Sequence, residues 1–217
     1  MGNIVLFGLP GAGKGTQADN LKNDFNLFKV STGDLLREEI KKESPLGKKI
    51  KSTIDQGHLV DDLTINNLVE NILCNENYYN RLIFDGYPRN LQQAKNFDIL
   101  IKKNNQAISC VLNLNVQQDV IIKRILGRRV CSKCGLIFNN YFSTAKNEKH
   151  QCDAKYLHKR SDDNEETLKN RFEIYNNETL PILDYYKNQN LLYEIDGMGD
   201  IHTIYKEIRH IILSLEA

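Results

Sequence analysis

The sequence Gly8-Leu9-Pro10-Gly11-Ala12-Gly13-Lys14-Gly15-Thr16 decides the fold of this chain. It follows the apolar run Ile4-Val5-Leu6-Phe7 and precedes an amphipathic stretch from Gln17 to Asp24, which is the order strand, loop, helix. Glycines let the loop wrap closely, so that several backbone N–H groups point at one anion, and the following helix adds the positive end of its dipole. The stretch therefore predicts a phosphate-binding loop rather than the alternative, a glycine-rich turn with an incidental lysine.

Lys14 and Thr16 supply the side-chain chemistry of such a loop. Lys14 can reach the β- and γ-phosphates of a nucleotide, and Thr16 offers a hydroxyl near the metal ion that accompanies them. The general pattern has Ser or Thr directly after the lysine, whereas this chain has Gly15 there and the hydroxyl one residue later.

Composition and charge narrow the class of protein. The 217 residues include 29 basic and 28 acidic ones, for a net charge of +1, which does not support general binding to nucleic acid or to membranes. The apolar runs are too short to span a bilayer, and the first strand begins too early to leave room for a signal peptide. We therefore expect a cytoplasmic protein with one core and small insertions.

Strand-like and helix-like stretches alternate along the chain, which favours an α/β fold with a parallel sheet of about five strands flanked by helices. The apolar strand-like runs are residues 3–7, 27–30, 81–84, 108–114 and 191–195. Residues 31–60 read as two short inserted helices, and the mixed runs of about 128–160 indicate a second small insertion. Pro181 is expected to kink or divide a long helix that starts near Asn164. The last helix carries Ile201, Ile204, Ile208, Ile211 and Leu215 on one face.

Charged residues near the loop point to phosphoryl transfer. Asp85 ends the run Leu82-Ile83-Phe84, and an acid at the carboxyl end of such a strand faces the ligand crevice, where it can hold Mg²⁺ through water. The alternative, a turn or helix-capping aspartate, is disfavoured because Arg89 places a guanidinium close by. The other candidate arginines, read as phosphate ligands rather than solvated side chains, are Arg37, Arg124, Arg128, Arg160 and Arg171. An acceptor that is itself a phosphate needs no general base.

Three of the five cysteines form a metal-site pattern. Cys131-Ser132-Lys133-Cys134-Gly135 places two thiolates three residues apart, and Cys152 lies far enough on to close a small loop. A tetrahedral structural zinc site needs a fourth ligand, and the candidates are His150, Asp153 and His158. The alternative is a degenerate or empty site.

With these residues the chain resembles adenylate kinase, in the bacterial form with a long lid, over essentially its whole length. The motifs that carry the resemblance are residues 8–17, Ser31-Thr32-Gly33-Asp34-Leu35-Leu36-Arg37, Phe84-Asp85-Gly86-Tyr87-Pro88-Arg89, Gly127-Arg128-Arg129-Val130-Cys131 and residues 160–167. The glycine at position 15 is also what that family carries. The resemblance implies that a monomer transfers a phosphoryl group reversibly from Mg-ATP to AMP, which gives two ADP.

The resemblance also implies a division of the chain and a role for each motif. A core would comprise residues 1–30, 61–126 and 164–217, with an AMP-binding insertion of residues 31–60 and a lid of residues 127–163 that close over the substrates and exclude water. ATP would be bound by Gly11, Ala12, Gly13, Lys14, Gly15, Thr16, Arg124, Arg128, Ile137, Phe138 and Gly199. AMP would be bound by Thr32, Arg37, His58, Leu59, Val60, Gly86, Tyr87, Pro88, Arg89, Gln93, Arg160 and Arg171. The catalytic groups would be Lys14, Asp85, Arg89, Arg128, Arg160 and Arg171.

The resemblance implies a structural zinc ion in the lid, but this chain departs from the family at the fourth ligand. That ligand usually lies three residues after the third cysteine, where this chain has Lys155. The expected ligands are therefore Cys131, Cys134, Cys152 and Asp153, with His150 as the alternative to Asp153.

Other functions use parts of the same pattern. A kinase for UMP or CMP would share the phosphate machinery, although Thr32 and the long lid favour AMP by resemblance. A nucleotide-operated switch would bind ATP without needing arginines from three separate segments. A zinc-ribbon nucleic-acid module is disfavoured by the near-zero net charge.

Overall fold

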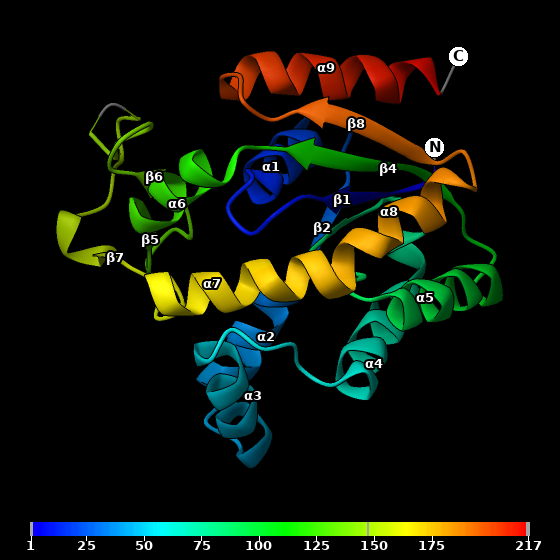
Figure 1. The fold of residues 1–217 in the computed structure, drawn as a ribbon, viewed down its shortest axis with the longest axis horizontal. Helices are drawn as coiled ribbons and strands as arrows, with labels where there is room; N and C mark the ends of the chain where they lie inside the picture. The colour runs from blue at the N-terminus through cyan, green and yellow to red at the C-terminus, as the bar shows by residue number, and fades with distance from the viewer. Residues whose placement is uncertain (1, 147, 216–217) are drawn as a thin grey trace.

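The computed structural model describes residues 2–146 and 148–215, and a five-stranded parallel sheet runs through its centre (Figure 1). The strands are β1 (Asn3–Phe7), β2 (Phe28–Ser31), β3 (Leu82–Asp85), β4 (Ile108–Asn115) and β8 (Leu192–Asp196). Their order in the sheet is β2-β3-β1-β4-β8, and every pairing is parallel. The predicted α/β fold class is confirmed, and each predicted strand lies within a residue or two of an observed one.

Helices cover both faces of this sheet. They are α1 (Lys14–Asp24), α2 (Thr32–Lys41), α3 (Pro45–Asp55), α4 (Asp62–Leu73), α5 (Leu91–Lys103), α6 (Gln118–Leu126), α7 (Glu165–Ile174), α8 (Leu180–Lys187) and α9 (Ile201–Ser214). In β1, Ile4 and Leu6 pack toward α1 and α9, whereas Val5 and Phe7 pack toward α4, α5 and α8. Because side chains alternate along a strand, a wholly apolar β1 must be covered on both sides.

A second, antiparallel sheet lies beside the main one at the lid end of the molecule. Its strands are β5 (Arg128–Cys131), β6 (Ile137–Asn139) and β7 (Leu157–His158), in the order β6-β5-β7. The described residues also include two short 3₁₀ turns, Glu76–Tyr78 and Ala154–Tyr156. The break in pattern that the sequence shows near residue 128 thus coincides with the start of β5.

Local signals in the sequence fix several helix starts. The Ser31 hydroxyl accepts a hydrogen bond from the Asp34 N–H at the start of α2, and Ser44 caps α3 ahead of Pro45 in the same way. Asn164 caps α7 by accepting a hydrogen bond from the Thr167 N–H. These caps fix the residues at which α2, α3 and α7 begin.

Two observed features refine the sequence-based expectations. The long helix is divided by a π-helical turn, Tyr175–Thr179, immediately before α8 and its Pro181. In α9 the buried residues are Ile204, Ile208 and Ile212, whereas Ile201 and Leu215 are 42% and 41% exposed. The buried part of α9 is therefore shorter than its apolar face, which extends beyond the buried residues at both ends of the helix.

Candidate active site

The glycine-rich loop, residues 8–13, joins β1 to α1. Gly8, Gly11 and Gly13 have φ values of 136°, 89° and 104°, in the region that residues with a Cβ rarely adopt. The Lys14 Nζ donates hydrogen bonds to the Gly8 carbonyl at 2.7 Å and to the Leu9 carbonyl at 3.1 Å. The loop thus has the shape of an anion cradle, with its lysine folded back on its own carbonyl groups.

Asp85 lies beside this loop because β3 pairs with β1. Leu6 is paired with Asp85 across the two strands, and a Cβ placed on Gly15 would lie 3.3 Å from the Asp85 Oδ2. Burial lowers the pKa of Lys14 to about 8, and the charges of nearby arginines oppose the raising effect of Asp85. A bound phosphate would place a negative charge next to the Lys14 ammonium and favour its charged form.

A pocket lies on the other side of the strand ends, between α2, α4 and α5. It is lined by Thr32, Leu36, Leu59, Val60, Ile65, Gly86, Arg89 and Gln93. The Thr32 hydroxyl donates to the Gly86 carbonyl at 2.8 Å, and the Arg89 Nε donates to the same carbonyl at 2.7 Å. Six of the residues expected to bind AMP therefore meet in one pocket, with apolar walls and one guanidinium.

Other residues expected at this site lie around the pocket rather than in its lining. His58 is exposed, whereas Tyr87 and Pro88 are buried. The Tyr87 hydroxyl donates to the Asn66 Oδ1 at 2.9 Å, which fixes the turn that follows β3. Arg37 extends from α2 and forms an ion pair with Asp34.

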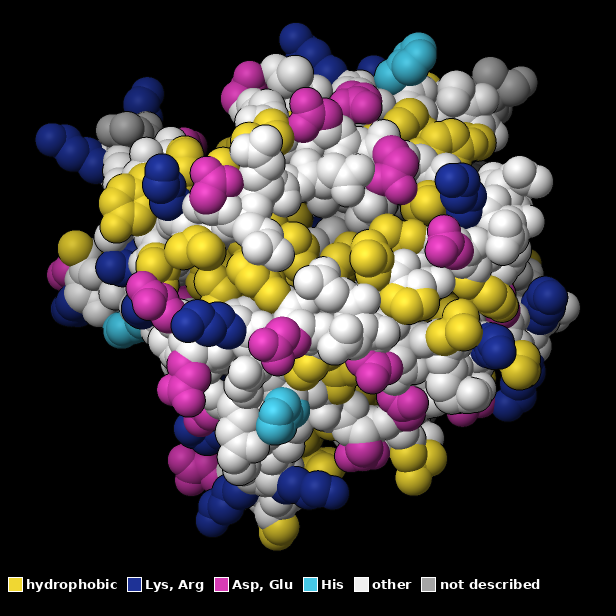
Figure 2. Space-filling view, in the orientation of Figure 1, with side chains coloured by type: hydrophobic (Ala, Val, Ile, Leu, Met, Phe, Trp, Pro, Cys, Tyr) yellow, Lys and Arg dark blue, Asp and Glu magenta, His cyan; other side chains and the backbone are white. Residues whose placement is uncertain are grey.

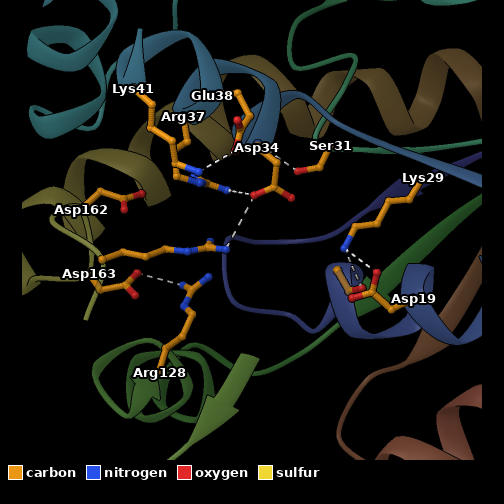
Figure 3. A network of polar contacts seen from close by, with 12 residues as sticks. Asp19, Lys29, Ser31, Asp34, Arg37, Glu38, Lys41, Arg128, Asp162 and Asp163 are labelled. Carbon is orange, nitrogen blue, oxygen red and sulfur yellow. Dashed lines mark hydrogen bonds and ion pairs between the residues drawn. The ribbon is translucent and has the colours of Figure 1, made fainter. Parts of the chain in front are cut away.

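Arginines from three segments each lie beside a carboxylate. Figure 3 shows Arg128 beside Asp163 and Arg37 beside Asp34. The ion pairs are Arg128–Asp163 at 3.0 Å, Arg171–Asp162 at 2.9 Å and Arg160–Asp34 at 3.9 Å. Burial first, and then the charges of neighbouring guanidinium groups, lower the pKa values of Arg89 and Arg160 to about 10. Both side chains stay protonated at neutral pH, so the site concentrates positive charge where phosphates would lie.

The Arg128–Asp163 pair leaves hydrogen-bonding capacity unused. Asp163 is fully buried, and neither of its carboxylate oxygens nor the Arg128 Nη2 has a hydrogen-bond partner among the described residues, despite the 3.0 Å contact. Burial raises the pKa of Asp163, although Arg128 acts in the opposite direction. Buried polar atoms without partners are rare in folded proteins, so this pair is suited to receive a ligand with its own polar atoms.

Of the expected ATP-binding residues outside the loop, Arg124 contacts the loop directly. Arg124 bridges the loop and the segment after β8, since its guanidinium donates to the Ala12 carbonyl at 3.2 Å and to the Gly197 carbonyl at 3.1 Å. Its guanidinium carbon also lies 6.0 Å from the centre of the Phe142 ring. Gly199 is exposed near this bridge.

The two lid residues expected at the adenine, Ile137 and Phe138, differ in how exposed their side chains are. Ile137 is 39% exposed, whereas Phe138 is 5% exposed and packs on the ring of His150, with centroids 4.7 Å apart. Phe138 therefore faces the interior of the lid in this structure. The sequence does not single out Phe142. It also does not identify Asp34 and Asp162 as partners of the arginines, although they lie within the motifs of residues 31–37 and 160–167.

A cluster of possible metal ligands lies in the small antiparallel sheet. The ligand atoms of Cys131, Cys134, His150 and Cys152 all lie within 4.8 Å of one another. The Cys134 Sγ is 3.5 Å from the His150 Nε2, and hydrogen bonds from two backbone N–H groups lower the pKa of Cys131 against the raising effect of its burial. Three thiols and one imidazole are a ligand set typical of structural zinc.

The fourth member of this cluster is His150, so the expectation of Asp153 is corrected. The Asp153 carboxylate turns away to cap the following 3₁₀ turn, accepting a hydrogen bond from the Lys155 N–H at 2.9 Å, and pairs with the Lys155 ammonium at 3.6 Å.

The face of the molecule seen in Figure 2 carries charges of both signs. Figure 2 shows apolar side chains in a band across the middle of one face, with basic and acidic side chains interspersed around it. Within residues 2–146 and 148–215, none of the helices has the length and apolar character that crossing a bilayer requires.

Comparisons with known proteins agree over nearly the whole chain. A family model described as adenylate kinase matches residues 6–191. The adenylate kinase of Pelagibacter ubique (strain HTCC1062) is 44% identical over 210 residues, which cover 97% of this chain and 99% of that protein. The adenylate kinase of Archaeoglobus fulgidus is 38% identical over 217 residues, covering 99% and 100% of the two chains, and that of Enterococcus faecalis is 39% identical over 212 residues, covering 97% and 98%.

Proposed function

We propose which groups carry each step of the reaction in this chain, which belongs to the adenylate kinase family. Its activity is the reversible reaction of ATP and AMP to two ADP. The observation that supports the assignment most strongly is the convergence of Arg89, Arg128, Arg160 and Arg171 between the glycine-rich loop and the pocket. Two phosphate sites that face each other are what transfer between two nucleotides requires.

ATP is bound on the loop side. The N–H groups of residues 11–16 and the Lys14 ammonium hold its phosphates, while Arg124 and Arg128 contact it from α6 and β5. Ile137 and the backbone near Gly199 line the adenine. Thr16 and Asp85 would hold Mg²⁺, Asp85 through water, and the ion would neutralise part of the charge of the phosphates.

AMP is bound in the pocket, with Thr32, Leu59, Val60 and Gln93 around its base. Arg89 and Arg171 hold its phosphate, and Arg37 and Arg160 approach the same phosphate from α2 and the edge of the lid. The AMP phosphate attacks as an anion, so the protein provides positioning and positive charge rather than a general base.

The same proposal divides the chain into parts that move. Residues 31–60 close over AMP and residues 127–163 close over ATP, against a core of residues 1–30, 61–126 and 164–217. Closure excludes water, which would otherwise accept the phosphoryl group, and assembles the arginines only when both nucleotides are present.

A structural zinc ion held by Cys131, Cys134, His150 and Cys152 is part of the proposal. The small sheet β5–β7 has few buried apolar residues, so a metal would supply stability that its core does not. We also expect a monomer in the cytoplasm, as the sequence suggested.

One assay tests the acceptor and the reaction together. The purified protein is mixed with Mg-ATP and, separately, with AMP, UMP, CMP, GMP or no acceptor, and each nucleoside diphosphate is quantified. We expect rapid ADP formation with AMP alone.

Each other result of this assay would support one of the alternative functions. Turnover with UMP or CMP would overturn the choice of AMP but keep the chemistry. Binding of ATP without transfer to any acceptor would overturn the phosphoryl-transfer assignment and favour a nucleotide-operated switch.

A further inference from the structure

Thr179 makes an unusual contact for a threonine within a helical segment. It ends the π-helical turn Tyr175–Thr179, is 6% exposed, and donates its hydroxyl hydrogen to the Arg89 carbonyl at 2.7 Å. A helical threonine commonly returns its hydroxyl to the carbonyl four residues earlier. Here the Tyr175 carbonyl accepts the Leu180 N–H instead, and the Thr179 hydroxyl reaches a residue 90 positions away in the sequence.

Arg89 is held at three points close to its backbone. Its N–H donates to the Gln93 Oε1 at 2.8 Å, its Nε donates to the Gly86 carbonyl at 2.7 Å, and its own carbonyl accepts from Thr179. Within residues 2–146 and 148–215, its two terminal nitrogens make neither a hydrogen bond nor an ion pair with the protein. Those nitrogens are therefore free to bind a phosphate from a fixed base.

The charges around Arg89 explain why such a tether matters. Arg171 lies close enough that its charge, after burial, is the largest influence lowering the pKa of Arg89. Two guanidinium groups that face one phosphate position repel each other when that phosphate is absent. A hydrogen bond to a backbone carbonyl holds Arg89 without neutralising the charge that binds the ligand.

The helical run from α7 to α8 carries both anchors. Arg171 projects from α7, and Thr179 follows in the π turn of the same continuous segment. Single π turns within α-helices occur often at functional sites, and this one precedes Pro181, which has no N–H to continue an α-helical pattern. One rigid element thus sets the place of Arg171 directly and of Arg89 through Thr179.

We propose that Thr179 is a positioning residue that holds Arg89 in register with Arg171 for the phosphate of the monophosphate substrate. The inference rests on the proposed function, in which both arginines bind the AMP phosphate. Loss of the hydroxyl leaves the Arg89 carbonyl without its partner and lets the turn after β3 shift, so the effect falls on AMP and not on ATP.

Steady-state kinetics of Thr179→Val and Thr179→Ser test the proposal. We expect Thr179→Val to lower kcat/KM for AMP by about tenfold, the size expected for one lost hydrogen bond, with the KM for Mg-ATP unchanged. Thr179→Ser keeps the hydroxyl and is expected to restore most of the loss. If Thr179→Val does not fold, Thr179→Ala against Thr179→Ser gives the same comparison, since both lack the methyl group and differ only in the hydroxyl.

A double-mutant cycle with Arg89→Met separates positioning from general destabilisation. We expect Thr179→Val to have no further effect on AMP kinetics once the Arg89 guanidinium is absent. Thr203→Val is the control for loss of a threonine hydroxyl, because that hydroxyl bonds Asp200 at the start of α9, and we expect this variant to leave the AMP kinetics unchanged.

The outcomes distinguish this inference from the proposed function. Equal losses for AMP and ATP, or additive effects in the cycle, would overturn the positioning role of Thr179. An Arg89→Met variant with unchanged AMP kinetics would instead overturn the assignment of Arg89 to the AMP phosphate.

Discussion

At the scale of single residues, the charge of Lys14 is set by opposing effects. Burial lowers its pKa to about 8, and Asp85 only partly offsets that effect. In the unfolded chain the lysine has its ordinary, higher pKa, so the unfolded state binds more protons between about pH 8 and pH 10.5. The contribution of Lys14 to stability therefore increases as the pH rises through that window.

Binding of Mg-ATP should raise the pKa of Lys14 and take up a proton. Phosphate oxygens favour the charged ammonium, so the fraction of a proton taken up per ATP should grow from about pH 7 to about pH 9, where the free side chain becomes mostly neutral. Calorimetric titration in two buffers of different ionisation enthalpy measures this uptake. The control is Lys14→Arg, which keeps its charge over this range; the same pH-dependent uptake in both proteins would contradict the assignment.

At the scale of elements, the glycine-rich loop allows the effect of backbone strain on stability to be distinguished from the effect of steric contact when a side chain is added. Gly11 and Gly13 both have positive φ values, but a Cβ on Gly11 would lie 2.7 Å from the Ile125 Cγ1, whereas a Cβ on Gly13 would meet nothing within 4 Å. The same substitution at both positions therefore carries the same kind of backbone strain and a different packing cost.

Gly11→Ala should destabilise the protein more than Gly13→Ala. We expect Gly13→Ala to lower the free energy of unfolding by about 1–2 kcal/mol through backbone strain. Gly11→Ala should lower it by about a further 1–3 kcal/mol, because Ile125 has to move. Urea unfolding of the two variants measures the difference, and equal losses would show that the contact with Ile125 is relieved without cost.

The small antiparallel sheet makes a prediction about its metal. Wild-type protein dialysed against metal-free buffer should retain about one zinc ion per chain, and a strong chelator should lower its melting temperature. His150→Ala should lose the metal or bind it more weakly, whereas Asp153→Ala should keep it. Elemental analysis of the three proteins decides between the two ligands, and retention by His150→Ala with loss from Asp153→Ala would reverse the assignment.

The elements also show which parts of the structure a sequence can predict. The strands and the glycine-rich loop follow from short-range patterns, because alternation and the need for positive φ act within a few residues. The choice of His150 over Asp153 could not be predicted, since both lie near Cys152 and only the fold shows that Asp153 caps the next turn. The Thr179–Arg89 contact joins residues 90 positions apart, which no local pattern reports.

At the scale of the whole molecule, the segments that we assign to the two nucleotides meet along α7. The Ser161 hydroxyl donates to the Asp55 Oδ1 at 2.8 Å, and the Asn170 Nδ2 donates to the Gln56 carbonyl at 3.0 Å. These few polar contacts, together with the Arg160–Asp34 pair at 3.9 Å, connect residues 31–60 with the end of the lid and with α7. Sparse polar contacts of this kind permit one segment to move relative to the other.

The measurement that tests the central claim most directly is amide hydrogen exchange, read by mass spectrometry of peptides. The claim is that the two nucleotides occupy separate sites that different segments cover. We expect Mg-ATP alone to slow exchange in residues 8–16 and 127–139, and AMP alone to slow it in residues 31–60 and 86–93, with CMP in place of AMP giving no such protection. Both segments should be protected together at saturating Mg-ATP and AMP. Protection of residues 127–163 by AMP alone, or no protection of residues 31–60 by AMP, would contradict the account.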